Sequence, residues 1–257
     1  MKEESLHHRS YRKLDYTNLS LIIITHLLVY AFFVVFVLLF VKQLSLLYSS
    51  LAEALLHNRL PGLHLETVDL FYTQIWILTG EGSFPTQVQL VTVGAISLVA
   101  LLLSYVFSKL SLPLRLIIQV VCVLNILACL FFWFWAKYFP YELFTFSGLY
   151  LKTEIGMWLA LPLILLFSLA PIPISILPKI GLITFILLYT YIFGFMRYAL
   201  LLYILHQYSY LWMSFLYFIL GAFFDFAFMI AFYSNFLSIV APNIQKDKRK
   251  WRWLYSA

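Results

Sequence analysis

Residues 19–41 read LSLIIITHLLVYAFFVVFVLLFV, an apolar run whose interior polar side chains are Thr25 and His26. The hydrocarbon core of a bilayer is about 30 Å thick, and a helix of around 20 apolar residues crosses it. The run is long enough, so it predicts a membrane-spanning helix. It is too long for the apolar region of a cleavable signal and lacks a small-residue cleavage site, so we expect it to remain as an anchor.

Five more stretches of this kind follow along the chain. The six expected spans cover residues 19–41, 87–107, 116–136, 155–177, 180–205 and 210–237. The sequence therefore predicts an all-α, polytopic integral membrane protein, organised as a single membrane domain over residues 1–257. Prolines inside a span are tolerated where neighbours satisfy the freed carbonyls. Pro171, Pro173 and Pro178 equally fit the end of the fourth span and a tight turn into the fifth.

The composition excludes a soluble enzyme and a secreted disulfide scaffold. Hydrophobic residues make up 63% of the chain and charged residues 11%, whereas soluble domains carry about 25% charged residues. The 25 Phe and 18 Tyr residues exclude a disordered chain. Cys122 and Cys129 share one apolar stretch and form no CxxC or Cys/His cluster, so we expect them to be small packing residues.

A long outer connection, residues 42–86, separates the first two spans. Leu44, Leu47, Leu51 and Leu55 recur there at helical spacing. The pattern predicts either a helix lying in the membrane interface or a helical extension of the first span packed on its neighbours. Residues 68–78, VDLFYTQIWIL, are too short to span and predict a second interfacial helix or a re-entrant segment.

The net charge of +6 follows the orientation rule for membrane helices. With both termini in the cytoplasm, twelve Lys and Arg residues lie on the cytoplasmic side and four on the outer side. The cytoplasmic set is Lys2, Arg9, Arg12, Lys13, Lys109, Arg115, Lys179, Lys246, Lys248, Arg249, Lys250 and Arg252, and the outer set is Lys42, Arg59, Lys137 and Lys152. We therefore expect cytoplasmic termini in the cell (inner) membrane. The tail KDKRKWRW, residues 246–253, is expected to anchor on anionic lipid headgroups and not to bind nucleic acid.

Two formal charges lie well inside the expected spans, where a charge costs roughly 2.5–3.5 kcal/mol on insertion scales. Arg197 lies about 12 Å below the outer surface in the fifth span, and Asp225 lies near the middle of the sixth. The two spans are adjacent and antiparallel, so the side chains could meet. Three interpretations stay open: a buried ion pair that locks two helices, a polar site lining an outward-facing cavity, or Arg197 snorkelling to the headgroups.

Further polar groups gather toward the same outer half. His206 ends the fifth span, and Glu154 opens the fourth, where a carboxylate suits the positive end of the helix dipole. With Arg197 and Asp225, they make four candidates for a catalytic or binding site.

The sequence predicts no cofactor or metal site. The sequence holds no HExxH, GxSxG or Walker A motif. His26 is expected to be a helix-contact residue, and Gln119, Asn125 and Ser104 are expected to form interhelical hydrogen bonds.

Residues 150–237 resemble the exosortase/archaeosortase family of polytopic membrane transpeptidases in their layout. The start of a span, Lys152–Gly156, precedes an apolar helix that ends in prolines. A basic turn, Pro178–Lys179, leads into a helix that carries Arg197 in the stretch IFGFMRYALLLYIL, and a last span holds Gly221.

In that family an outer-facing Cys, an Arg and a His cleave a sorting signal through a thioester, which requires an activated thiolate. Arg197 matches the family's Arg. The Cys position would fall near residues 152–154 and the His position near residues 215–218, where this sequence has neither residue type. The resemblance therefore implies a non-catalytic relative that handles envelope proteins or polysaccharide export.

Two functions follow from these observations. The first is a non-catalytic membrane scaffold or subunit that works in the lipid bilayer with other membrane or envelope proteins. The second is an enzyme or carrier whose outward-facing site, around Arg197, Asp225, Glu154 and His206, acts on an anionic or lipid-linked substrate, because Arg suits a carboxylate or phosphate.

Overall fold

The computed structural model describes residues 12–14, 19–60, 62–106, 111–246 and 251–253. Six helices there are long and apolar enough to cross a membrane, so the chain is an all-α polytopic membrane protein, as the sequence predicted. The basic residues Lys2, Arg9, Lys109, Lys248, Arg249 and Lys250, on which part of the expected orientation rests, lie outside the described residues.

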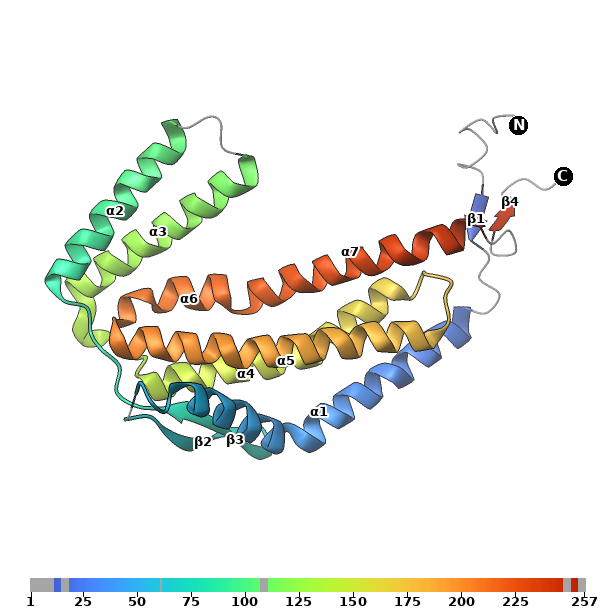
Figure 1. The fold of residues 1–257 in the computed structure, drawn as a ribbon, viewed down its shortest axis with the longest axis horizontal. Coiled ribbons are helices and arrows are strands. Elements are labelled where there is room, and N and C mark those ends of the chain that lie inside the picture. Colours follow the sequence, from blue (N-terminus) through green and yellow to red (C-terminus); the bar gives the residue numbers. More distant parts are fainter. Residues whose placement is uncertain (1–11, 15–18, 61, 107–110, 247–250, 254–257) are drawn as a thin grey trace. The chain divides into compact units, whose positions relative to one another are not determined.

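Figure 1 labels the α-helices and the β-strands of the chain. In chain order they are β1 (Arg12–Leu14), α1 (Leu19–Leu56), β2 (His64–Leu70), β3 (Thr73–Thr79), α2 (Gln87–Val106), α3 (Leu112–Trp135), the 3-10 helix η2 (Ala136–Tyr138), α4 (Leu143–Leu169), α5 (Ile176–Gln207), the 3-10 helix η3 (Tyr210–Trp212), α6 (Met213–Leu220), α7 (Ala222–Lys246) and β4 (Trp251–Trp253). Strand β1 pairs with β4, and β2 pairs with β3, both antiparallel.

The fourth span differs most from its expected position. Helix α4 begins at Leu143 and ends at Leu169, two residues before Pro171, whereas residues 155–177 were expected. Pro171 and Pro173 lie in the turn and Pro178 in the first turn of α5, where a missing N–H is tolerated. The interpretation of these prolines as the end of the span and a turn is therefore confirmed.

Helix α1 continues well past the first expected span. Its 38 residues extend about 57 Å, against about 30 Å for a bilayer core. Leu44 to Leu55 belong to this helix, so the alternative of a helical extension of the first span is confirmed, and a position of these residues in the membrane interface stays a prediction.

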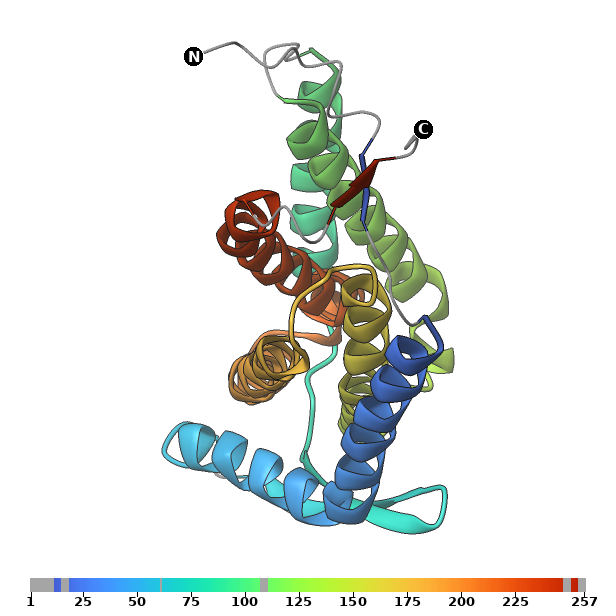
Figure 2. The ribbon, with the colours of Figure 1, turned by 90° about the vertical axis from the view of Figure 1, so that its right-hand side faces the viewer.

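The prediction of an interfacial helix at residues 68–78 was wrong, because these residues form most of a β-hairpin, and the alternative of a re-entrant segment stays a prediction. The pairing runs from His64↔Thr79 to Leu70↔Thr73 and leaves a two-residue loop, Phe71–Tyr72. Ile75 and Ile77 are fully buried, and β-branched and aromatic side chains recur along β3, as strands favour. The hairpin lies against the C-terminal part of α1 (Figures 1 and 2).

Side-chain hydroxyls form hydrogen bonds with the backbone groups on the edge of β3 that does not pair with β2. Ser45 Oγ accepts a hydrogen bond from the Trp76 N–H at 3.1 Å, and Ser49 Oγ donates to the Trp76 carbonyl at 2.7 Å. Two residues on, the Tyr198 hydroxyl accepts from the Leu78 N–H and donates to the Leu78 carbonyl, both at 3.0 Å. Helices α1 and α5 thus replace the third strand that would otherwise pair here.

Helices α2 and α3 form an antiparallel pair. Gln119 Nε2 donates to Ser104 Oγ at 3.3 Å, which confirms one of the expected interhelical hydrogen bonds. A Cβ built on Gly94 would lie 3.8 Å from Cys129 Sγ, so this cysteine packs closely against the facing helix. Cys122 and Cys129 are both buried and free, as expected of small packing residues.

The chain divides into two compact units. One comprises Met1–Leu38, Trp158–Tyr189 and Ala227–Ala257, and the other comprises Leu39–Met157 and Thr190–Phe226. The core of the second unit includes Tyr48, Leu143 and Leu205, and that of the first includes Leu161 and Ile183, all fully buried. The single membrane domain expected from the sequence stays a prediction.

The hairpin loop stores backbone strain at Phe71. Its φ is 49°, a left-handed conformation that a bulky side chain rarely adopts, and its side chain is 86% exposed. We expect Phe71→Gly to slow amide hydrogen exchange of residues 64–79, because glycine adopts this conformation without steric cost. Phe71→Val, the matched control, should speed exchange, since β-branched residues tolerate positive φ least. Equal exchange in the two variants would contradict this account.

Candidate functional site

Arg197 is the centre of a buried polar cluster in the second unit. Its Nη2 donates to Asp225 Oδ1 at 2.6 Å and to Glu154 Oε1 at 3.2 Å. Its Nη1 donates to the backbone carbonyls of Leu220 and Gly221 at 2.9 and 3.1 Å. The expected meeting of Arg197 and Asp225 is therefore confirmed, and Glu154 joins them.

The carbonyls that Arg197 binds belong to a break in the sixth span. Helix α6 ends at Leu220, and α7 begins at Ala222. Gly221 has φ −88° and ψ −137°, and a Cβ there would overlap the Tyr217 carbonyl oxygen, so this close approach requires glycine. A break inside a membrane is tolerated where the freed backbone groups find partners within the protein. The Arg197 guanidinium is that partner.

Glu154 departs from its expected place, whereas Asp225 lies near the middle of the sixth span, Tyr210–Pro242, as expected. Glu154 does not open a helix, because α4 begins at Leu143, and Glu154 lies roughly 16 Å further along. Asp225 is the residue at a helix start, in the first turn of α7, where a carboxylate is stabilised by the positive end of the dipole. Lys152, expected on the outer side of the membrane, lies within α4 as well.

The cluster is buried and carries unequal charge. Glu154 is 2% exposed, and Arg197 and Asp225 are each 3% exposed. One guanidinium faces two carboxylates, so the fully ionised cluster would hold one uncompensated negative charge, which is costly away from water. Arg197 Nε and Asp225 Oδ2 are buried and have no hydrogen-bond partner among the described residues.

Aromatic rings enclose the cluster. Tyr150 lies one helical turn before Glu154, and its side chain interacts electrostatically with that carboxylate. Its ring stacks on Tyr198, with centroids 5.4 Å apart and planes at 10°. Tyr48, fully buried, packs on Tyr198 at 5.7 Å. Since the Tyr198 hydroxyl binds Leu78, the same ring contacts both the aromatic enclosure and the hairpin.

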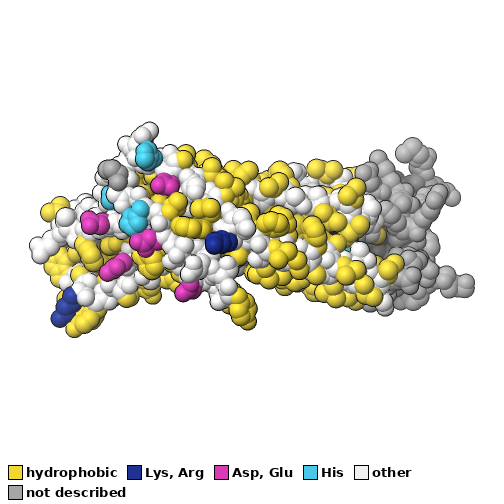
Figure 3. Space-filling model, turned by 90° about the horizontal axis from the view of Figure 1, so that it is seen from below, with side chains coloured by type: hydrophobic (Ala, Val, Ile, Leu, Met, Phe, Trp, Pro, Cys, Tyr) yellow, Lys and Arg dark blue, Asp and Glu magenta, His cyan; other side chains and the backbone are white. Residues whose placement is uncertain are grey.

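His206 lies apart from the cluster. It follows Arg197 by nine residues, about 14 Å along α5, and its Nδ1 hydrogen-bonds the Glu81 carbonyl. It lines a hollow of about 700 Å³ with His64, Glu66 and Glu142. Figure 3 shows acidic and histidine side chains close together on this part of the surface.

One ion pair sits in that hollow. His64 Nε2 lies 2.9 Å from Glu66 Oε1, and both side chains are exposed. The hydrogen bond to Glu66 raises the pKa of His64, and a second one to the Gly62 carbonyl adds to this effect. The hollow is therefore polar, of mixed charge and accessible to water.

The thiols belong to a different element from the cluster. Cys122 and Cys129 lie on α3, and the residues that surround Arg197 come from α4, α5, α6 and α7. Within the described ranges, no three His, Cys, Asp or Glu side chains are grouped so that they could hold a metal ion.

No family model, curated protein or solved structure matches this chain. The resemblance to exosortases stays a prediction.

Sequence reasoning missed the partners that complete the cluster. The carbonyls of Leu220 and Gly221 have no side-chain signal, and Tyr48 is distant in sequence. Gly194 does carry a signal, because it lies three residues before Arg197 and so shares its helix face. A Cβ at Gly194 would lie 2.9 Å from the Tyr48 hydroxyl and 3.4 Å from Glu154 Oε2.

We expect Gly194→Ala to lower the free energy of unfolding by about 1–3 kcal/mol, because the added methyl displaces the buried Tyr48 ring or the Glu154 carboxylate. Gly156→Ala is the matched control. A Cβ there meets nothing within 4 Å, so the variant should gain roughly 0.5–1 kcal/mol of helix stability. Denaturant unfolding in detergent measures both. Equal stability of the two variants would show that Gly194 is not needed for close packing.

Proposed function

We propose that the chain is a non-catalytic membrane scaffold or subunit, similar to an exosortase without its nucleophile, that handles envelope proteins or exported polysaccharide. One observation supports this proposal: both terminal nitrogens of the Arg197 guanidinium already donate hydrogen bonds within the protein. Nη2 donates to two carboxylates, and Nη1 donates to two backbone carbonyls. An arginine held in this way joins helices and has no terminal nitrogen reserved for a substrate.

The hairpin loop supports the scaffold by offering a surface to partners. Phe71 and Tyr72 are 86% and 104% exposed. Exposed aromatic side chains are enriched where proteins contact one another. The carboxylates of Glu66, Asp69 and Glu81 lie on or beside the same hairpin, so the surface suits an envelope partner with basic residues.

A second candidate function, an enzyme or carrier for a lipid-linked substrate, is favoured by an apolar hollow. It measures about 700 Å³ and is lined by aromatic and apolar side chains that include Phe131, Phe139, Phe146, Tyr217 and Phe218. The Tyr217 hydroxyl hydrogen-bonds Thr153 at 2.8 Å, next to Glu154 in the chain. A lipid tail in the hollow would therefore contact Tyr217, which hydrogen-bonds the residue next to Glu154 of the buried cluster.

Removing the cluster as a whole separates the two functions. Arg197→Met alone strands two buried carboxylates and should cost about 3–5 kcal/mol of stability. The triple variant Arg197→Met, Glu154→Gln, Asp225→Asn leaves no buried charge and should be more stable than the single variant. The triple variant also leaves the Leu220 and Gly221 carbonyls without a donor, so we expect the surface proteome and exported polysaccharide to change only in proportion to any loss of membrane abundance.

Membrane abundance is the control for this comparison, measured by quantitative blotting. The triple variant could reach wild-type abundance and yet cause the same surface changes as loss of the whole chain. That result would overturn the scaffold proposal. The same result would support a site at Arg197.

We also propose that both termini are cytoplasmic and that the chain resides in the inner membrane, on the strength of the twelve-to-four bias of Lys and Arg. An alkaline phosphatase fused after Ala257 should be inactive, because it folds only outside the cytoplasm. The same reporter inserted after Tyr72, in the hairpin loop, should be active. The opposite pattern would reverse the orientation.

A further inference from the structure

A second hollow lies in the first unit, where three spans end. It measures about 260 Å³ and is lined by residues of α1, of the turn after α4 and of the first turn of α5. The spans concerned begin at Ser20, end at Leu169 and begin at Ile176. Because the ends of spans are expected in the headgroup region, we place the hollow at the depth where a membrane presents phosphate groups.

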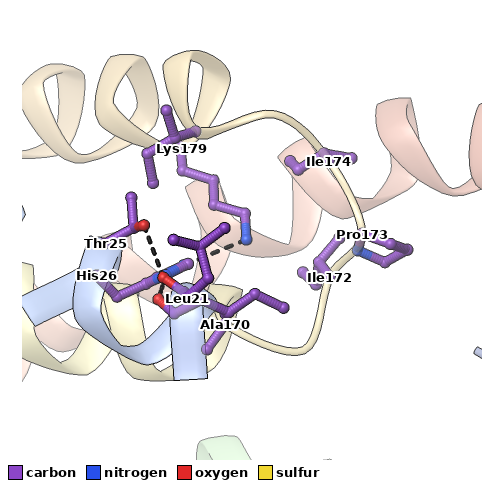
Figure 4. Close-up of a pocket in the computed structure, with 10 residues that line it drawn as sticks. Leu21, Thr25, His26, Ala170, Ile172, Pro173, Ile174 and Lys179 are labelled. Carbon is purple, nitrogen blue, oxygen red and sulfur yellow. Dashed lines mark hydrogen bonds between the residues drawn. The ribbon is translucent and has the colours of Figure 1, made fainter. Parts of the chain in front are cut away.

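The polar side chains of this hollow are Lys179, His26 and Thr25, and the Thr25 hydroxyl donates to the Leu21 carbonyl (Figure 4). The Lys179 side chain reaches from α5 toward His26 on α1, and the turn between α4 and α5 runs around them. Lys179 is 3% exposed, and its Nζ lies 3.2 Å from His26 Nε2. A lysine is rarely buried this far unless its charge is paired.

His26 does not supply a negative charge that would pair with the Lys179 ammonium. His26 Nδ1 lies 2.7 Å from the Ile22 carbonyl and therefore carries the proton that it donates there. Its Nε2 is then the acceptor for one of the three Lys179 N–H donors. Within the described ranges the ion pairs are His64–Glu66, Arg197–Glu154 and Arg197–Asp225, so the Lys179 ammonium has no carboxylate partner there.

The helix start adds to the positive potential. Lys179 lies in the first turn of α5, and the first N–H groups of a helix have no intrahelical partner. A cation is disfavoured at this end of the dipole, whereas an anion is stabilised there. A buried ammonium that has no carboxylate partner among the described residues, beside a helix start, favours an anion in this hollow.

We propose that the hollow formed by Lys179, His26 and the first turn of α5 binds a phosphate group. The group lies beside Lys179 Nζ, accepts its remaining N–H donors and neutralises the buried charge. The group comes from an anionic lipid headgroup or from free inorganic phosphate. The hollow opens where headgroups lie, and its other lining residues, such as Leu21 and Ile176, are apolar and suit the adjoining acyl chains.

The test uses the full chain, purified and reconstituted in nanodiscs of phosphatidylcholine, with or without phosphatidylglycerol. Phosphatidylglycerol should raise the melting temperature of the wild-type chain, because a ligand that binds the folded state stabilises it. Lys179→Met keeps the length of the side chain and should weaken phosphatidylglycerol binding about tenfold to a hundredfold. Lys179→Arg should restore most of it.

Lys42→Met is the matched control, because Lys42 is an exposed lysine of α1 and loses the same charge. It should bind phosphatidylglycerol as the wild type does. His26→Gln keeps an acceptor for Lys179 and should weaken binding less than Lys179→Met does, which tests the site without removing the charge.

The source of the phosphate group follows from a second titration. Inorganic phosphate is added to the chain in phosphatidylcholine nanodiscs. If it raises the melting temperature of the wild type but not of Lys179→Met, the hollow is a site for free phosphate. A response to phosphatidylglycerol alone identifies a lipid site. Equal responses of Lys179→Met and Lys42→Met to both probes, with both variants folded, would overturn the proposal.

Discussion

A helix that breaks inside a membrane must find partners for its freed carbonyls within the protein, since lipid offers none. In this chain the break falls at Gly221, and the Arg197 side chain supplies the donors. The same guanidinium binds Asp225 at the start of α7 and Glu154 on α4. One side chain thereby connects three spans, so the positions of α4, α5 and the α6–α7 break depend on a single residue.

The hairpin obeys the same constraint with neutral groups. The backbone groups of strand β3 find donors and acceptors in the hydroxyls of Ser45, Ser49 and Tyr198. Tyr198 follows Arg197 directly in α5, and its ring lies on Tyr150, one turn before Glu154. The charged cluster and the hairpin are therefore joined through adjacent residues of one helix. A change in either one displaces groups that the other contacts.

Hydropathy predicted the membrane spans because a bilayer accepts little else over that length. The Arg197–Asp225 contact followed from two facts, that the charges lay in neighbouring antiparallel spans and that arginine is long. The position of Glu154 within its helix was missed because residues 143–152 mix aromatic and polar side chains and resemble a loop, although they form the start of α4. The hairpin was missed because its strands are short and both faces of residues 68–78 carry apolar side chains, which obscures a period of two.

The hydroxyls on strand β3 also limit how this chain can associate. A strand edge with unpaired N–H and carbonyl groups recruits strands from other molecules, and this is how exposed hairpins begin to aggregate. Trp76 and Leu78 already have side-chain partners, so β3 is closed to such pairing. A sheet that extends this hairpin into another molecule must grow from the free edge of β2. That strand carries Glu66 and Asp69, one on each face, and their negative charges repel a second copy paired alongside.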